Sequence, residues 1–361
     1  MQTPKPKVAV IYTAPQTVLS DIGSVMELAG YRAALPPDVP TLLKINISWQ
    51  RYYPACSTTP WQLEGVIQTL RQGGYREIIP AQNGTVVVNS YEGELKNKHL
   101  AALEKCGLKS VHLGDPGVEW VKYEPQGKML VLDKVFPKGI RIPALFKGKN
   151  IVHLPTMKTH VFTTMTGAMK NAFGGLLNER RHWTHSVIHE TLVDLLTIQR
   201  EIHPGIFAVM DGTFAGDGPG PRAMRPLLKN TLLASADPVA IDAVAAKIMG
   251  FDPMSLAFLR LAHEGGLGCA DLSQIEIVGE DISRVNWRFQ GAEETLASRG
   301  QKLIYHGALQ PLEHLLLRTF IAPWSYAASR LYFDFFWYPF VGRGRVQEAM
   351  KTGWGKLFQS Y

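Results

Sequence analysis

Residues 148–175 read GKNIVHLPTMKTHVFTTMTGAMKNAFGG. The fold predicted for the rest of the sequence is built around this stretch. Ile151 and Val152 are typical of the end of a short buried strand. The residues after them carry polar side chains of the kind that hold anions: His153, Lys158, Thr159, His160, Thr163, Thr164, Thr166, Lys170 and Asn171. Because ligands in open α/β sheets sit beyond the carboxyl ends of strands, the stretch predicts a binding site. The alternative is a polar connection whose lysines face water.

Strand and helix patterns alternate before this stretch. Short apolar or β-branched runs predict strands, and longer periodic runs that end near glycine predict helices. Their order is strand 7–13, helix 18–30, strand 42–48, helix 60–72, strand 76–80, helix 92–106 and strand 110–113. Alternation at this spacing favours parallel strands joined by right-handed crossovers.

The same alternation continues after the stretch. It predicts helix 183–201, strand 205–210, strand 230–234, a helix from Pro238 to residue 249, helix 255–264 and strand 275–278. Asp237 precedes Pro238 and is expected to cap that helix. The sequence therefore predicts an α/β fold in residues 1–310, with a mostly parallel or mixed sheet flanked by helices. A small β insertion is expected at about 118–143, and residues 311–361 form a separate aromatic, helical tail.

The composition limits the classes of function. The chain has 361 residues and 46% hydrophobic content, which is enough for one large core. Its net charge of +7 favours acidic ligands or anionic membranes, with nucleic acid as the weaker option. The three cysteines, Cys56, Cys106 and Cys269, are too far apart for a zinc knuckle or a local iron–sulfur run. With no signal-peptide pattern at the start and no uncharged run of twenty residues, we expect a cytoplasmic protein.

A second polar segment follows the predicted strand 205–210. Residues 211–222 read DGTFAGDGPGPR, in which the alternate glycines Gly216, Gly218 and Gly220 let backbone N–H groups approach a ligand. Arg222 could pair with a phosphate or carboxylate through its planar fork. The alternative is a tight glycine-proline turn without a ligand.

These segments suggest a division of roles at one sheet edge. We expect Lys158, Lys170 and Arg222 to bind an anion, and His160 or Asp211 to move protons. Lys158 is also a candidate catalytic residue, together with His160 and Asp211. Asn171 and Asn46 are further candidate ligand-binding residues, because Asn46 ends the predicted strand 42–48 and the polar turn 81–85 reaches the same edge.

Three histidines suggest a divalent metal site. His182, His185 and His189 fall at i, i+3 and i+7 and would share one face of the predicted helix 183–201. Imidazoles at this spacing can chelate a divalent metal, with Asp211 or Asp217 supplying an oxygen. Alternatively they hydrogen-bond the backbone or help to hold an anion.

The tail, residues 311–361, combines an aromatic and apolar load with basic residues after it. Apolar followed by basic residues is typical of an interfacial membrane anchor, whereas the same aromatics could equally pack on the main domain or on a second subunit of a homo-oligomer. The basic residues are Arg343, Arg345, Lys351 and Lys356. The aromatic and apolar residues are Leu312, Leu315, Leu316, Leu317, Phe320, Ile321, Trp324, Tyr326, Tyr332, Phe333, Phe335, Phe336, Trp337, Tyr338 and Phe340.

Several motifs occur in an order that resembles the domain-of-unknown-function 362 family. They are KINIS, TTPW, PTMKTH, TGAMKNAFGG, HETLVDL, DGTFAGDGPGP and ASADPVAIDAVA, between about Lys44 and Gly279. The resemblance points to Lys158, His160, Lys170, Asn171, His189, Asp211, Gly216, Gly218, Pro219, Asp237 and Asp242. Many members carry a ferredoxin-like cysteine-rich module, which implies redox work. This chain has no such module, so we expect no iron–sulfur cluster from its own cysteines.

The resulting hypothesis is an enzyme that acts on an acidic small molecule, at the membrane surface if the tail anchors it. The resemblance adds a reductive reaction with an external electron donor. The sequence does not define the cofactor. A divalent metal is considered only because of the three histidines. The rival hypothesis is a non-catalytic binding or assembly protein that docks through residues 311–361 to a membrane or a protein complex.

Overall fold

A mixed β-sheet forms the centre of the structure, which is a computed structural model that describes residues 4–85, 87–291, 296–305, 307–308, 312, 327–328 and 330–361. In this described part the sheet has ten strands: β1 (Lys7–Tyr12), β2 (Thr41–Ile45), β3 (Ile78–Gln82), β4 (Val111–His112), β7 (Asn150–Leu154), β8 (Thr156–His160), β9 (Thr164–Thr166), β10 (Ile206–Asp217), β11 (Arg225–Ser235) and β12 (Glu276–Gly279). The order is β12-β1-β11-β10-β7-β2-β3-β4, with β8 paired to β10 and β9 to β8.

The sheet is parallel on one side and antiparallel on the other. Strands β10, β7, β2, β3 and β4 run parallel to one another, whereas β11 runs antiparallel to both β1 and β10. The predicted fold class, a mostly parallel or mixed sheet flanked by helices, is confirmed.

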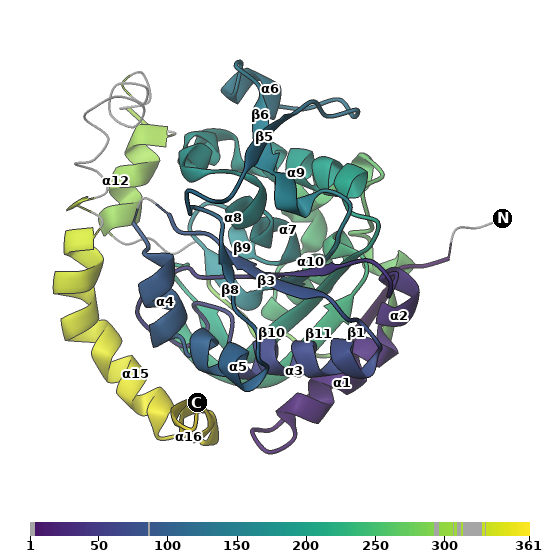
Figure 1. Ribbon diagram of the computed structural model, residues 1–361. Coiled ribbons are helices and arrows are strands. Elements are labelled where there is room, and N and C mark those ends of the chain that lie inside the picture. Colours follow the sequence, from purple (N-terminus) through teal and green to yellow (C-terminus); the bar gives the residue numbers. More distant parts are fainter. Residues whose placement is uncertain are drawn as a thin grey trace.

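Helices cover both faces of the sheet (Figure 1). One face carries α1 (Val18–Leu28), α3 (Pro60–Gln72) and α5 (His99–Lys105), and the other carries α7 (Ala168–Asn171), α9 (Ile188–Ile202), α10 (Pro238–Met249) and α11 (Ala257–Glu264). Alternate strand residues face opposite cores, since Val8 and Val10 belong to one apolar cluster and Ala9 to the other. Further helices are α2 (Tyr31–Ala34), α4 (Ser90–Lys96), α6 (Leu132–Val135), α8 (Phe173–Leu176) and α12 (Leu296–Tyr305).

The strand β10 is twice as long as the sequence predicted. Its first part, Ile206–Ala208, pairs with β7, and its second part pairs with β8, where Gly216 lies opposite Lys158. The polar segments after the two predicted strands were expected to leave the sheet, and this differs in the structure: residues 156–160 form a strand, and residues 211–217 continue β10. The polar side chains suggested segments outside the sheet. In the structure the backbones of the two segments pair with each other, and this pairing cannot be read from the side chains.

Two predicted helices differ in the structure. The predicted helix 92–106 is divided into α4 and α5, because Lys98 adopts a left-handed conformation with φ 62° and Asn97 donates to the backbone oxygen of Trp49. The predicted helix 183–201 begins at Ile188, and residues Glu179–Val187 form a 3₁₀ helix. The expected cap at Asp237 is confirmed, since its carboxylate accepts from the backbone N–H groups of Val239 and Ala240.

The β insertion is a separate two-stranded sheet of β5 (Trp120–Tyr123) and β6 (Ile140–Pro143), paired antiparallel. Its connection is anchored to α9 by Asp194, whose carboxylate accepts hydrogen bonds from the backbone N–H groups of residues 130, 131 and 132. Burial raises the pKa of Asp194, but these three donors favour its charged form.

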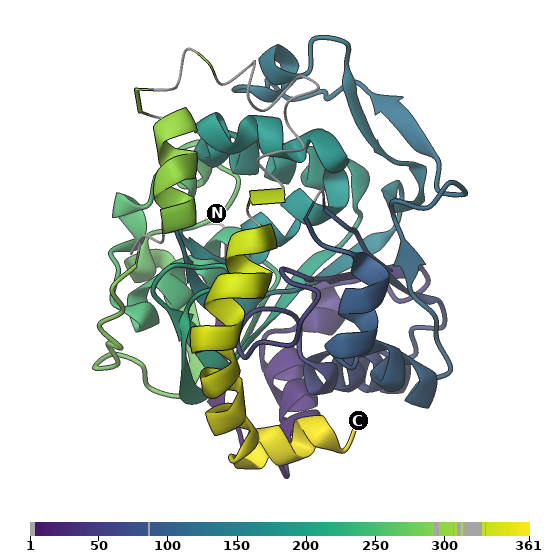
Figure 2. The same cartoon turned by 90° about the vertical axis from the view of Figure 1, so that its left-hand side faces the viewer.

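The C-terminal residues form a π-helix (Leu331–Gly342), α15 (Arg343–Met350) and α16 (Gly353–Gln359), which run across one face of the molecule in Figure 2. Trp337 packs on Trp49 and Tyr53, and Trp354 on Trp61. The predicted packing of aromatics on the main domain thus holds for this part. The run Leu315, Leu316, Leu317, Phe320, Ile321, Trp324 and Tyr326 lies outside the described residues.

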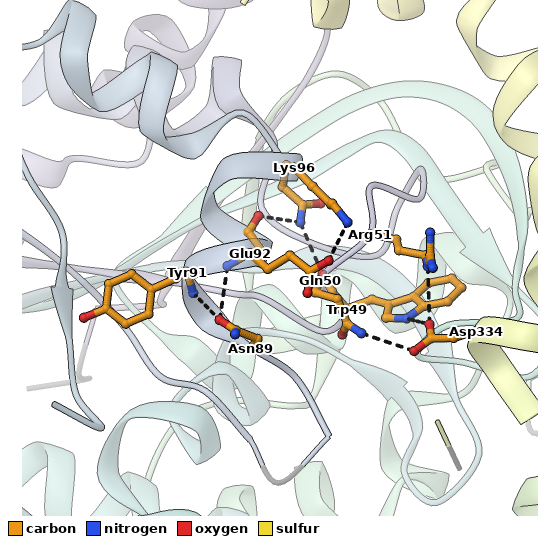
Figure 3. Close-up of polar contacts among 10 residues, drawn as sticks. Trp49, Gln50, Arg51, Asn89, Tyr91, Glu92, Lys96 and Asp334 are labelled. Carbon is orange, nitrogen blue, oxygen red and sulfur yellow. Dashed lines mark hydrogen bonds and ion pairs between the residues drawn. The ribbon is translucent and has the colours of Figure 1, made fainter. Parts of the chain in front are cut away.

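Asp334 fastens the π-helix to the loop after β2 (Figure 3). Its carboxylate accepts hydrogen bonds from Trp49 Nε1 at 3.1 Å and Gln50 Nε2 at 3.3 Å, and lies 3.4 Å from Arg51 Nε. Arg345 adds two hydrogen bonds to the backbone oxygens of residues 223 and 224. The inner side of the tail is therefore held by polar as well as apolar contacts.

Gln62 gives a test of how α3 is joined to the sheet. Its buried side chain donates to the backbone oxygens of Pro155, at 3.0 Å, and Val209, at 2.7 Å. Replacing it by leucine removes a donor from two buried carbonyls, so we expect Gln62→Leu to lower the free energy of unfolding by about 1–3 kcal/mol. Urea denaturation measures this. Gln68→Leu, at a half-buried position of the same helix, is the control, and an equal loss in both variants would contradict the assignment.

Candidate functional site

The two polar segments predicted from the sequence meet at β8. Thr159 Oγ1 donates to the backbone oxygens of Gly218, at 2.6 Å, and Gly216, at 3.2 Å. Lys158 and His160 flank Thr159 and therefore both project from the opposite side of the strand. All three side chains are buried. The parallel pairing of β8 with β10 thus accompanies a lysine and a histidine on the same side of β8, both buried.

Lys158 lies in a polar cluster built by the loop after β2. Its ammonium group donates to Ser48 Oγ at 3.0 Å and to the backbone oxygen of Cys56. Asn46 accepts from Ser48 Oγ at 3.1 Å, and Arg222 Nε donates to the backbone oxygen of Ser48 at 3.0 Å. Three predicted site residues, Asn46, Lys158 and Arg222, are therefore gathered around Ser48, which the sequence did not single out.

The contact between His160 and Lys170 fixes the protonation of both groups. His160 Nδ1 accepts a hydrogen bond from the backbone N–H of Phe162 at 3.1 Å, so a neutral imidazole carries its proton on Nε2. That nitrogen lies 3.2 Å from Lys170 Nζ. Lys170 must then accept the hydrogen bond from Nε2–H, which requires an uncharged amine. Burial, followed by the charges of Lys158 and Arg181, lowers the pKa of Lys170 to about 7, in agreement with this geometry.

A second buried lysine, Lys44, is linked to the segment that carries Lys170. It lies in β2, and Asn171 Nδ2 donates to its backbone oxygen at 2.8 Å. Burial and the charge of Arg181 lower the pKa of Lys44 to about 7, and burial lowers that of Lys158 to about 8. A lysine inside the apolar run LLKINIS is the sequence signal that could have identified Lys44.

Lys44, Lys158 and Lys170, called the lysine cluster below, are linked electrostatically: the charge of Lys158 acts on Lys170, and that of Arg181 acts on both Lys44 and Lys170. In the part of the chain that the structure describes, none of these three lysines forms an ion pair with a carboxylate. A buried cation without a partner either loses its proton or binds an anion. The arrangement can therefore bind an acidic ligand and can also present an uncharged amine at neutral pH.

Asp211 has a structural role at the start of α3. Its carboxylate accepts from Thr59 Oγ1, from Trp61 Nε1 at 3.0 Å and from the backbone N–H of Thr213 at 2.6 Å. Burial raises its pKa, and these donors oppose the rise. Because both oxygens are occupied, the structure offers no support for the expected role of Asp211 as a general base.

The glycines of residues 216–220 allow close approach of two backbones. A side chain at Gly220 would collide with the backbone oxygen of Thr159, and one at Gly216 would meet Met224 Sδ at 2.6 Å. Gly218 has φ 105°, which favours glycine. These contacts explain the glycines by packing against β8, whereas the sequence predicted N–H groups for a ligand.

The three histidines do not share a helix face. His182 and His185 lie in the 3₁₀ helix and His189 in α9. Residues 4–85, 87–291 and the shorter described ranges contain no group of three or more His, Cys, Asp or Glu side chains that could hold a metal ion. His185 instead stacks on Tyr305 at 5.5 Å, and burial lowers its pKa to about 3. The metal site inferred from spacing is therefore not formed, because the α-helical period it assumed starts only at Ile188.

A pocket of 480 Å³ lies at the carboxyl ends of β3 and β4. Its polar lining includes Asn83, Thr85, Asn89, Ser90, Asp115 and Asn178, and none of the site residues predicted from the sequence. Arg181 lies between this pocket and the lysine cluster, since it donates to the backbone oxygen of Gly84 at 2.7 Å and its charge lowers the pKa of Lys44.

Comparisons with known proteins agree with the resemblance seen in the motifs. The family model described as Domain of unknown function (DUF362) matches residues 41–247. A thylakoid-associated protein of Synechocystis is 25% identical over 262 residues, covering 70% of this chain and 76% of that protein. No solved structure matches the chain. In the described residues, no helix is both long and apolar enough to cross a bilayer.

Lys44 gives a test of the buried charge. Its pKa falls from 10.5 in the unfolded chain to about 7 in the fold, so the unfolded state binds more protons between those values. The free energy of unfolding must therefore rise with pH from about 7 towards 10. We expect Lys44→Met to reduce this slope by up to about 1.4 kcal/mol per pH unit, measured by urea denaturation between pH 7 and 9. The exposed control Lys138→Met should keep the slope, and an unchanged slope in Lys44→Met would refute the depressed pKa.

Proposed function

The chain belongs to the DUF362 family, and on this premise we propose that it is an enzyme that binds an acidic small molecule at Lys44, Lys158 and Lys170. One observation carries the proposal: the buried Lys44 and Lys158 and the half-buried Lys170 have lowered pKa values and no carboxylate partner among the described residues. An anionic group of the ligand would favour the protonated forms of Lys44 and Lys158.

The same cluster supplies a group for proton transfer. Lys170 is an uncharged amine hydrogen-bonded to His160 and is half-buried, so a proton taken from a ligand can be shared between the two groups. This assigns the proton transfer to Lys170 and His160, with Lys158 as the residue that holds the anion. The reductive reaction with an external electron donor is supported only by the family resemblance, in which many members carry a ferredoxin-like module.

Binding of anions tests the proposal directly. We expect inorganic phosphate or succinate to raise the melting temperature of the protein, because a ligand present at about 100 times its Kd stabilises the fold by about 2.7 kcal/mol. Lys158→Met should lose most of this response, and Lys138→Met should keep it. The response should also weaken as the pH rises through about 7 to 8, where the buried lysines lose their protons.

Native mass spectrometry of protein taken directly from its host identifies the natural ligand. A bound acidic small molecule that is lost in Lys158→Met would support the proposal. If no anion stabilises the protein and no small molecule is retained, the binding function is wrong.

A second candidate function, docking to an anionic membrane, is favoured by the outer side of the π-helix. In a π-helix residues four or five positions apart come to one side. Leu331, Phe335, Phe336 and Phe340 lie on this outer side and are 64%, 72%, 59% and 77% exposed. Arg343 and Lys351 are exposed in the following turns, and the net charge is +7. Exposed aromatics beside basic residues suit the interface of a bilayer, and the Synechocystis relative is named for its association with thylakoids.

Sedimentation with vesicles that contain phosphatidylglycerol tests the docking function. We expect the wild-type chain to bind them, and the triple variant Phe335→Ser, Phe336→Ser, Phe340→Ser to bind at least about tenfold more weakly, since each phenylalanine contributes about 1.5–3 kcal/mol on burial. Leu95→Ser, which removes a leucine that is 60% exposed on α4, is the matched control. Equal binding of the triple variant and the wild type would exclude this surface as the anchor.

A further inference from the structure

A buried Ser–His–Glu network lies under the pocket at the ends of β3 and β4. Ser90 Oγ is 2.8 Å from His112 Nδ1, and His112 Nε2 is 2.9 Å from Glu94 Oε2. The three side chains are 8%, 5% and 7% exposed, and Ser90 lines the pocket. Ser90 and Glu94 are four residues apart in α4, so both face His112 from the same side of the helix. The anion-binding proposal makes no use of this network.

The surroundings fix which nitrogen of His112 carries the proton. Although burial raises its pKa, hydrogen bonds from His112 and Ser110 hold the pKa of Glu94 below its ordinary value, so the side chain is a carboxylate that can only accept. His112 Nε2 must therefore carry the hydrogen, and Nδ1 is left as the acceptor for the Ser90 hydroxyl. The ring of Tyr91 stacks on His112 at 3.6 Å and holds the imidazole in this plane.

We propose that Ser90, His112 and Glu94 form a second catalytic site, which cleaves an ester by acyl transfer to Ser90. Ser90 Oγ attacks the carbonyl carbon and its proton passes to His112 Nδ1. His112 returns the proton to the leaving alkoxide as the bond between the carbonyl carbon and that oxygen breaks. Water then attacks the acyl-serine and gives its proton to His112. A carboxylic acid leaves, and Ser90 regains its hydrogen.

The pocket lining selects the class of ester. Its amide side chains, Asn83, Asn89 and Asn178, are suited to hydroxyl or amide groups, and the carboxylate of Asp115 disfavours anionic substrates. A volume of 480 Å³ is that of a site for a small molecule. The substrate is therefore a small, polar ester that is uncharged or cationic, in contrast to the acidic ligand of the lysine cluster.

Covalent labelling of the full chain with a fluorophosphonate tests this site. We expect one equivalent of label on the peptide that contains Ser90, seen by mass spectrometry, and hydrolysis of p-nitrophenyl acetate that the label abolishes. Ser90→Ala should lose both. His112→Gln keeps a polar side chain but cannot carry the proton, so labelling should slow at least about 100-fold. Ser20→Ala, which removes an exposed hydroxyl from α1, should behave as the wild type.

Two results would overturn the proposal. One is the absence of label on Ser90 in wild-type protein that gives a cooperative melting transition. The other is a rate of labelling in His112→Gln equal to that of the wild type, which would show that the imidazole does not activate the serine. Neither result bears on anion binding, because Lys158 and the phosphate response belong to a different part of the sheet edge.

Discussion

The pairing of β8 with the second half of β10 is the constraint on which the site depends. Thr159 bonds to the backbone oxygens of Gly216 and Gly218, and this contact requires that neither the glycine segment nor Gly220 carries a side chain toward β8. Because Thr159 faces β10, Lys158 and His160 must face the other way, into the interior. One strand register therefore decides that two basic groups are buried together rather than exposed.

Burial disfavours the charged form of these basic groups, and in the described part of the chain no carboxylate pairs with the lysines to offset this. Asp211 in β10 and Asp242 in α10 are both buried, and each accepts hydrogen bonds at the start of a helix: Asp211 from Trp61 in α3, and Asp242 from the N–H groups of Ala168 and Met169 in α7. Neither carboxylate forms an ion pair with the lysines among the described residues. The lysines consequently have depressed pKa values, which suits them to bind an anion and to exchange protons near neutral pH.

The π-helix of the tail packs on the domain with one side and is exposed on the other. Asp334 and Trp337 contact the loop 49–53, and the guanidinium of Arg222 lies 5.4 Å from the ring of Phe333. The same π-helix exposes Phe335 and Phe340 on its other side. A partner that binds the outer side therefore acts on a segment that already contacts the residues around Ser48. The inner contacts also explain why tail aromatics need not signal a membrane, because Phe333, Trp337 and Trp354 pack on the domain.

The sequence by itself determined the alternation of strands and helices and the cap at Asp237, because these depend on local patterns. It also predicted that Lys158 and Arg222 lie near each other, from the general geometry of α/β sheets. Only the tertiary structure decided that 211–217 is a strand, that the histidines at 182, 185 and 189 form no metal-binding group among the described residues, and that Ser48 contacts Lys158. It also brought Ser90 and His112 together from separate elements. The physical reason is that strand pairing and burial depend on partners distant in the chain, and a polar residue in the sequence does not show whether water or another segment will satisfy it.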